Sequence, residues 1–280
     1  MRFDEPTLRF LGVVFQAADV QTACARVEAL LHAECESTLV VHANLNTVHR
    51  AQSDPDLMAA LAHPAALVLF EGIGLKVARW LVTGLWCPDT NGTDLVPAVL
   101  SRRRAAPLRV ALIGGARGVA VAAAEHLQAS QRQILIVGTW DGFEDCESES
   151  TLLSALAEAR PDLVLLGLGT PRQEKLGARW LEPAGARVVW AVGGLLDLWA
   201  GRKRRAPALW RAMRVEWLWR LLAYPRAYGG RYATQGAWLV AQVLRAWGRA
   251  ARRRWLSPSA PSAAVEPPAR RERVQASEAD

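Results

Sequence analysis

The stretch from Pro161 to Lys175, PDLVLLGLGTPRQEK, places the tightest limit on how this chain can fold. Its apolar run, Leu163 to Leu166, lies between a proline and two glycines, as expected of a short strand buried on both faces of a parallel sheet. Thr170 then suits a helix N-cap and Pro171 the first helical position. The stretch predicts a strand, a tight turn and a helix N-terminus that favours phosphate, although an ordinary capped turn would have the same residues.

The same order of strand, turn and helix recurs along most of the chain. The expected strands are 38–43, 67–70, 108–113, 134–137, 163–166 and 187–192. Strands separated by single helices need right-handed crossovers, so we predict an α/β fold with a mostly parallel, Rossmann-like sheet and helices on both faces. Ligands bind such sheets at the carboxyl ends of the strands. The turns at His42, Glu71, Gly114, Gly167 and Gly193 are expected to meet there.

Positive charge is concentrated near the C-terminus. The net charge is +7, yet residues 201–255 alone contain fourteen Lys or Arg, one acidic residue and six of the twelve tryptophans. We therefore expect three parts: an α/β body at 1–200, a basic helical appendage rich in Trp and Arg at 201–256, and a disordered tail at 257–280. The tail has too few large apolar residues to bury a core.

The basic appendage allows three interpretations. A solvent-exposed helical surface is the simplest, but it would leave many tryptophans in water. Binding of single-stranded nucleic acid suits the charge. Attachment to an anionic membrane surface suits both residue types, because tryptophan occupies the headgroup region and arginine attracts anionic lipid. We favour the membrane and expect no nucleic acid partner.

Several other classes are disfavoured. The four cysteines have neither the close pairs of a zinc site nor the density of a disulfide scaffold, so a reducing compartment is expected. No apolar run reaches about 18 residues, and the N-terminus lacks a signal-peptide pattern. Gly114–Gly118, GGARG, matches neither a dinucleotide fingerprint nor a P-loop, and is either a phosphate loop or a tight packing turn. Asp54-Pro55-Asp56 lies at a helix start rather than a strand end, so no metal or other cofactor is expected.

Six segments, in order and at their intervals, resemble the WecG/TagA/CpsF family of bacterial glycosyltransferases. They are HANLNTVHRAQSDPDL, FEGIGLKVARWLVTG, NGTDLVP, RVALIGGARGVA, PDLVLLGLGTPRQEK and AVGGLLDLWAGRKRRAP. The resemblance covers roughly Val13 to Tyr232, and its most specific parts are GLGTPRQEK and GGLLDLWAGRKRRAP.

The resemblance implies an enzyme, a peripheral protein on the cytoplasmic face of the plasma membrane. It would transfer N-acetylmannosamine, its uronic acid or a related sugar, with inversion, from a UDP donor to an acceptor on undecaprenyl diphosphate, for exopolysaccharide or another cell-envelope polysaccharide. The appendage would meet the membrane and complete the active site. The alternative is a non-catalytic relative that binds sugar nucleotide or lipid-linked glycan in an assembly complex. The sugar, the acceptor and the oligomeric state stay open.

Two residues are the catalytic candidates that the resemblance implies. Glu71 stands where the family has an aspartate proposed as the catalytic base, and a base must come within about 3 Å of the acceptor hydroxyl. His42 stands where the family has threonine, and a histidine could replace the base or contact the acceptor. Without the resemblance, Glu71 would more simply favour a helix dipole and His42 would be structural.

Asp89 stands where the family commonly has an arginine. If that arginine neutralises donor phosphates, then Lys76, Arg172 or the cluster at 202–205 must supply the charge instead. The expected substrate-binding residues are Asn44, Gly72, Thr93, Asp94, Gly114, Gly115, Gly169, Gln173, Gly193, Gly194, Asp197, Arg204, Arg205, Arg220 and Arg226.

Overall fold

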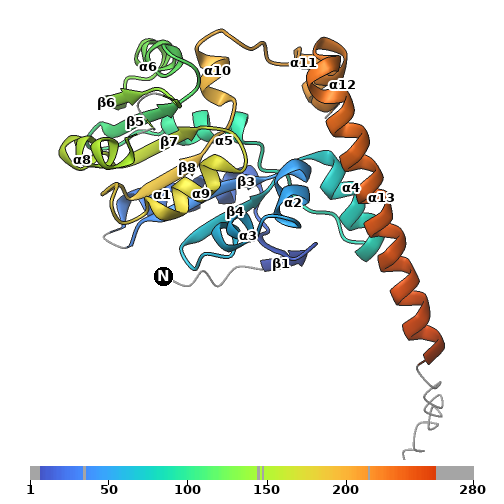
Figure 1. The fold of residues 1–280 in the computed structure, drawn as a ribbon. Helices are drawn as coiled ribbons and strands as arrows, with labels where there is room; N and C mark the ends of the chain where they lie inside the picture. Colours follow the sequence, from blue (N-terminus) through green and yellow to red (C-terminus); the bar gives the residue numbers. More distant parts are fainter. Residues whose placement is uncertain (1–6, 34–35, 144–145, 147, 214, 257–280) are drawn as a thin grey trace, which may run out of the picture.

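The computed structural model describes residues 7–33, 36–143, 146, 148–213 and 215–256 (Figure 1). The strands are β1 (Thr7–Phe10), β2 (Val13–Gln16), β3 (Thr38–Ala43), β4 (Ala66–Phe70), β5 (Leu108–Gly114), β6 (Ile134–Trp140), β7 (Leu163–Gly167) and β8 (Val188–Ala191). The body helices are α1 (Val20–His32), α2 (Leu45–Ala51), α3 (Pro55–Leu61), α4 (Ile73–Thr83), α5 (Gly92–Leu100), α6 (Val119–Ser130), α8 (Glu149–Ala159), α9 (Arg172–Arg179) and α10 (Leu195–Trp199). The C-terminal helices are α11 (Ala208–Ala212), α12 (Glu216–Ala223) and α13 (Pro225–Leu256).

The eight strands form one sheet in the order β1-β2-β4-β3-β8-β7-β5-β6. Among the described strands, β1 and β2 pair antiparallel, and the other neighbours pair parallel. Every residue of the central strand β3 is buried, as expected for a strand covered on both faces. The predicted mostly parallel α/β sheet is confirmed.

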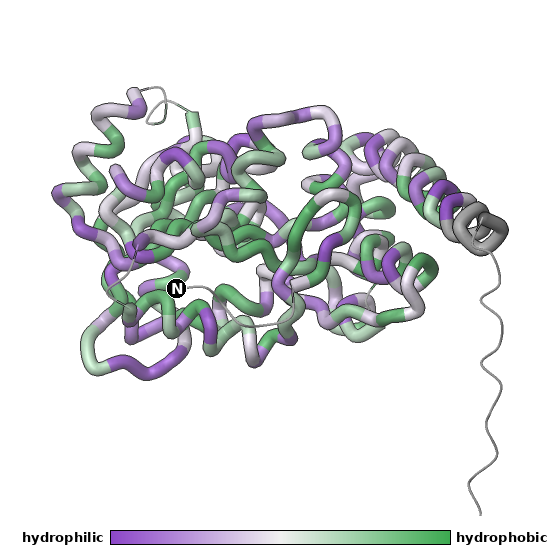
Figure 2. The backbone as a smooth tube through the Cα atoms, turned by 90° about the horizontal axis from the view of Figure 1, so that it is seen from below, coloured by the Kyte–Doolittle hydropathy of each residue, from purple (hydrophilic) through white to green (hydrophobic). Residues whose placement is uncertain are grey.

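Two hydrophobic cores lie on opposite faces of the sheet, because successive side chains of a strand point to opposite sides. In β7, Val164 and Leu166 join a core with α2, α3, α8 and α9, whereas Leu163 and Leu165 join a core with α1, α5, α6 and α10. Figure 2 shows the most hydrophobic segments in the interior. Helices therefore cover both faces, as the sequence predicted.

The helix ends confirm one prediction made from local sequence and contradict another. Pro55 does separate two helices, with Asp54 accepting a hydrogen bond from the Leu57 amide as the cap of α3. The predicted cap of α9 was wrong. That helix begins at Arg172, and the Thr170 hydroxyl donates to a Glu174 carboxylate oxygen at 2.8 Å instead of capping. The Thr170 hydroxyl therefore binds the buried carboxyl group of Glu174, one helical turn along the chain.

The basic appendage consists of α11, α12 and α13. The helix predicted over 232–255 begins earlier, at Pro225, and is 32 residues long. Its middle part packs on α2 and α4, so the appendage lies beside the carboxyl ends of β3 and β4 (Figure 1). Within the described residues, no helix is both long and apolar enough to cross a membrane. The tail predicted at 257–280 lies outside the described residues.

The glycine turn after β5 serves packing. A Cβ at Gly114 would lie 2.5 Å from the carbonyl carbon and oxygen of Gly167, and one at Gly115 would lie 2.4 Å from the Val119 side chain. The Gly115 amide also donates to the Gly167 carbonyl at 3.2 Å. Only glycine lets β5 and β7 approach this closely, so the packing interpretation of the turn is favoured over the phosphate loop.

Replacing Gly114 with alanine is expected to lower the free energy of unfolding by roughly 3 kcal/mol or more, because the new methyl group meets backbone atoms that cannot move away. Gly118→Ala is the matched control. Gly118 also has a positive φ, of 81°, but a Cβ there meets no atom within 4 Å, so only a backbone cost of about 1–2 kcal/mol is expected. Urea denaturation measures the free energy of unfolding of both variants. Equal losses of this free energy would contradict the packing role of Gly114.

Candidate active site

A cavity of about 780 Å³ lies between the carboxyl ends of the central strands and the appendage. The body contributes the turns after β3, β4, β7 and β8, and the appendage contributes α12 and the first half of α13. The sequence-predicted residues that line it are His42, Asn44, Glu71, Gly72, Thr93, Asp94, Gly169, Gln173, Gly193, Gly194, Arg204, Arg205 and Arg220. Of the five turns predicted to meet, those at His42, Glu71 and Gly193 line the cavity, as does Gly169 in the turn after β7, whereas the turn at Gly114 does not.

Glu71 follows β4 directly, and Gly72, with a φ of 96°, turns the chain into α4. The pKa of the Glu71 carboxyl is raised from 4.5 to about 7, chiefly by burial and in part by the charges of Asp89 and Glu216. Arg220 and a hydrogen bond with the Gly92 backbone act in the opposite direction. Desolvation is the largest of these effects. Glu71 is therefore a carboxyl group that exchanges its proton near neutral pH, which suits a general base.

Asp89 lies near Glu71 and also contacts Lys76. Asp89 Oδ1 accepts a hydrogen bond from the Gly72 amide at 3.2 Å, and its Oδ2 lies 4.0 Å from Nζ of Lys76. Lys76 is fully buried and also lies 5.0 Å from the Trp86 ring centroid. Because Lys76 is engaged with an acid and an aromatic ring, it is a poor replacement for the family's arginine.

His42 has a hydrogen-bond partner at each ring nitrogen. Its Nδ1 lies 2.7 Å from the Thr90 carbonyl oxygen, and its Nε2 lies 3.0 Å from the indole nitrogen of Trp190. The carbonyl can only accept and the indole can only donate, so the ring is neutral, with the proton on Nδ1. Burial lowers the pKa of His42 to about 4. No lone pair is left for a substrate proton, which corrects the interpretation of His42 as a catalytic residue and favours a structural role.

Gln173 joins two turns of the cavity wall. Its Oε1 accepts from the amides of Gly169, at 3.2 Å, and Gly193, at 3.0 Å, and its amide donates to Glu174. Asn44 caps α2 by accepting from the Asn46 and Thr47 amides. Both side chains were predicted to contact sugar hydroxyls. The carbonyl oxygen of each side chain already holds two backbone amides in place, so their larger contribution is to the shape of the cavity.

Five cationic side chains line the cavity: Lys203, Arg204, Arg205, Arg220 and Arg231. Arg205 donates to Asp94 Oδ1 at 2.5 Å, which ties the appendage to the start of α5. Glu216, the acidic residue noted within 201–255, lies 4.0 Å from Arg205 and 3.8 Å from Arg220. Glu216 therefore holds two arginines on the same side of the cavity. Such a cluster suits the negative charges of a diphosphate.

Some sequence-predicted residues lie away from the cavity lining. Asp197 accepts from Lys203 Nζ at 2.6 Å and anchors the turn after α10. Arg172 donates to the Gly142 carbonyl, on the side of the sheet nearer β6. The predicted binding residues that do not line the cavity are Gly114, Gly115, Asp197 and Arg226.

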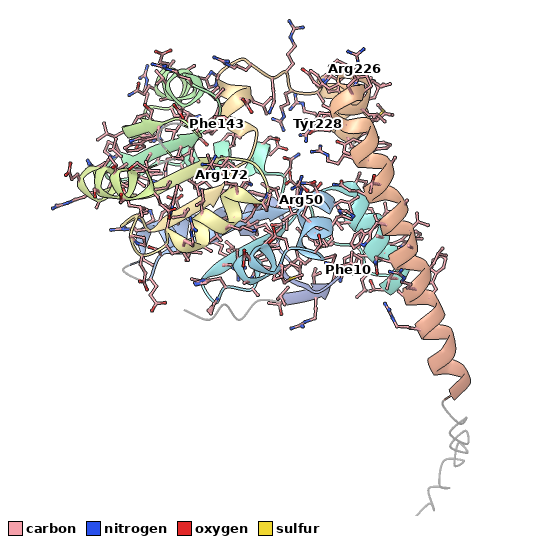
Figure 3. The ribbon with its side chains drawn as sticks, in the orientation of Figure 1. Phe10, Arg50, Phe143, Arg172, Arg226 and Tyr228 are labelled. Carbon is pink, nitrogen blue, oxygen red and sulfur yellow. The ribbon has the colours of Figure 1, made fainter. Side chains whose placement is uncertain are left out.

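Several lining residues were missed by sequence reasoning. Tyr224, Tyr228 and Tyr232 line the cavity, and Gln235 connects α13 to α2 by donating to Asn46 Oδ1 at 2.8 Å. Figure 3 shows Tyr228 on the side of α13 that faces the body. The four-residue spacing of the tyrosines was a usable signal, since it places them on one helix face. Among the described residues, no group of three or more His, Cys, Asp or Glu could hold a metal ion.

Replacing Glu71 with glutamine is expected to change how stability depends on pH. Between pH 4.5 and about 7 the folded wild type keeps a proton on Glu71 that the unfolded chain has lost, so this group makes stability fall as pH rises. His42 acts in the opposite direction over a similar range, so the variant must be compared with wild type at each pH. The variant should gain roughly 2–4 kcal/mol relative to wild type between pH 4.5 and 7.5.

Urea denaturation of both proteins at the two pH values measures this difference. A difference that stays constant would show that Glu71 ionises at the same pH in the folded and unfolded states. The assignment of Glu71 as a base held near neutrality would then be wrong.

The match to a known protein family agrees with this geometry. The family model of the glycosyl transferase WecG/TagA/CpsF family matches residues 8–253, which include the body, the cavity and most of the appendage. The match covers far more than half of the chain. The chain therefore belongs to the WecG/TagA/CpsF family of glycosyltransferases.

Proposed function

We propose that this glycosyltransferase moves a sugar, with inversion, from a UDP-sugar to a hydroxyl of an acceptor carried on undecaprenyl diphosphate. The observation that carries the proposal is the Glu71 carboxyl, which has a pKa near neutrality and lines a cavity that also holds five cationic side chains. A base and a cluster of cations facing one cavity are what a displacement at a sugar diphosphate needs.

The proposed reaction is a single displacement. The acceptor oxygen attacks the anomeric carbon from the face opposite the diphosphate, and Glu71 takes the hydroxyl proton as the new C–O bond forms. The bond between the anomeric carbon and the diphosphate oxygen breaks, and UDP leaves with its electron pair. The arginines stabilise the charge that develops on the leaving oxygen.

The appendage supplies the positive charge that the family commonly has near the position of Asp89. Arg204, Arg205 and Arg220 line the cavity from the appendage side, and Arg205 is fixed by Asp94. We assign these residues to the diphosphates of donor and acceptor. Thr93 and the glycine turns at 169 and 193–194 supply hydroxyl or backbone groups to the same cavity.

The finer details of the substrate stay predictions from the resemblance. They are N-acetylmannosamine, its uronic acid or a related sugar as the transferred group, exopolysaccharide or another cell-envelope polysaccharide as the product, and no metal or other cofactor. The alternative, a relative that binds these ligands without catalysis, is motivated by His42, Glu71 and Asp89, all three of which depart from the family's pattern. The raised pKa of Glu71 favours catalysis.

We propose that the protein attaches to the inner face of the plasma membrane through a surface shared by α4 and α13. Exposed large apolar side chains gather there, and the Trp247 indole donates to the Leu81 carbonyl at 2.8 Å, which holds the two elements together. Residues 73–88 and 225–256 contain no acidic residue. We call this the α4–α13 apolar surface; it consists of Trp80, Leu81, Leu85, Trp86, Val240, Leu244 and Trp247.

Glu71→Gln is expected to lower the rate of sugar transfer at least about 100-fold, because the glutamine side chain cannot remove the proton from the acceptor hydroxyl. The affinity for UDP should change less than about twofold, because Glu71 is assigned no contact with the nucleotide. In wild type, kcat/KM should rise with pH through the pKa of about 7. A UDP-release assay with lipid-linked acceptor and a panel of UDP-sugars measures the rate, and calorimetry measures UDP binding.

Glu71→Asp is the matched control, since it keeps a carboxylate and has the family's residue. It should retain measurable transfer. Full activity of Glu71→Gln would remove Glu71 from the mechanism. Binding of UDP-sugar without release of UDP by wild type, for every donor in the panel, would favour the non-catalytic alternative.

Leu85→Glu and Leu244→Glu are each expected to weaken binding to vesicles of phosphatidylglycerol and phosphatidylcholine by about tenfold or more, because each removes an exposed leucine from the proposed lipid contact and adds a negative charge. Vesicle sedimentation at two salt concentrations measures the binding. The two residues lie on different elements, in the loop after α4 and on α13.

Phe143→Glu is the control, because Phe143 is 62% exposed and follows β6, at the opposite edge of the sheet from β1 (Figure 3). Its vesicle binding should equal that of wild type. Equal loss in all three variants would mean that added negative charge alone weakens binding, and unchanged binding in Leu85→Glu and Leu244→Glu would remove this surface from the membrane contact.

A further inference from the structure

The three tyrosines of the chain form one continuous aromatic stripe. Tyr224 immediately precedes α13, and Tyr228 and Tyr232 follow at intervals of four residues on the same helix face. Neighbouring ring centroids lie 6.4 Å and 5.5 Å apart, and all three residues line the cavity. The sheet edge with Glu71 forms the opposite wall. The stripe is therefore a wall of the cavity rather than part of a hydrophobic core.

Further along α13, the same face packs directly on the body. Gln235 donates to Asn46, Leu239 packs against the core, and Val243 is buried in it. The inward-facing residues thus change from tyrosine to an amide and aliphatic side chains where the helix meets α2 and α4. The tyrosines occupy the part of the helix that lines the cavity instead of packing on α2 and α4, so a ligand in the cavity can contact them.

Cationic groups lie along the stripe. The Arg231 guanidinium lies 4.5 Å from the Tyr228 ring centroid and 5.5 Å from that of Tyr232, and Arg220 lines the same part of the cavity. Aromatic faces and hydroxyl groups suit a sugar ring, whereas guanidinium groups suit a diphosphate. The combination favours a ligand in which a sugar is joined to a diphosphate.

The open end of the stripe distinguishes the acceptor from the donor. From position 224 to 232 the stripe extends over about 12 Å of helix. Its outer end is open to the surface, since Tyr224 is 42% exposed and the neighbouring Leu222 is 62% exposed. An acceptor has a prenyl chain that must leave the cavity along an apolar path, and this end provides one.

Resting on the proposed function, we propose that the tyrosine stripe binds the lipid-linked acceptor. Its sugar lies against Tyr228 and Tyr232, its diphosphate lies beside Arg220 and Arg231, and its prenyl chain leaves past Tyr224. The donor UDP occupies the side of the cavity formed by the Gly169 and Gly193 turns.

The test compares two ligands on the full chain by calorimetry: UDP, and a water-soluble farnesyl diphosphate that carries N-acetylglucosamine. Tyr228→Ala is expected to weaken binding of the farnesyl probe about tenfold and to leave UDP binding unchanged within twofold. Tyr228→Phe keeps the ring and should retain the probe affinity within about threefold. Thr234→Ala, on the exposed side of the same helix, is the control for the fold and should bind both ligands as wild type does.

The remaining outcomes each contradict the proposal in a different way. Weaker UDP binding with unchanged probe binding in Tyr228→Ala would assign the stripe to the donor. Equal losses for both ligands would make the stripe a support of the whole cavity. If wild type binds both ligands and Tyr228→Ala does too, the stripe assignment alone fails. If wild type binds neither, the proposed function fails with it.

Discussion

The packing of α13 against the body is the constraint on which the rest of the site depends. Leu239 and Val243 anchor the helix on the core, and the hydrogen bonds from Gln235 to Asn46 and from Trp247 to Leu81 fix its position along the body. Because one rigid helix carries both the packing residues and the cavity wall, this contact determines where the tyrosine stripe lies. Side chains more than a hundred residues apart in the chain thus meet across one cavity.

Within that cavity, the same physical effect shifts two titratable side chains, the partly exposed Glu71 and the buried His42, toward their neutral forms. Desolvation raises the pKa of Glu71 and lowers that of His42. The consequences differ because of hydrogen bonding. His42 has a partner at each nitrogen, so its neutrality is structural. The Glu71 carboxyl instead lines open space, so its proton can be exchanged with a substrate.

The central sheet was predictable because its buried strands are short apolar runs bounded by turns. The strands β1 and β2 were missed, since four-residue segments with mixed burial give little periodic signal. For the site, the sequence located the turns but not the hydrogen-bond partners of the side chains in them. The Trp190 indole that fixes His42 is 148 positions away in the chain. The Thr170 hydroxyl binds the Glu174 carboxyl group, and the local sequence does not reveal that this carboxyl group is buried. The four-residue spacing of the tyrosines was visible in the sequence, whereas the direction in which they face depends on how α13 packs against the body.

Asp89 and Arg220 act in opposite directions on the pKa of Glu71, the residue proposed above as the base. An acid at position 89 neutralises the buried Lys76 and raises the pKa of Glu71, whereas an arginine there would lower it. In this chain the opposing positive charge comes from Arg220, on α12. Arg220 is in turn held by Glu216, which also contacts Arg205. The charge that lowers the pKa of Glu71 thus belongs to the appendage, so the proton affinity of Glu71 depends on how α12 and α13 sit against the body.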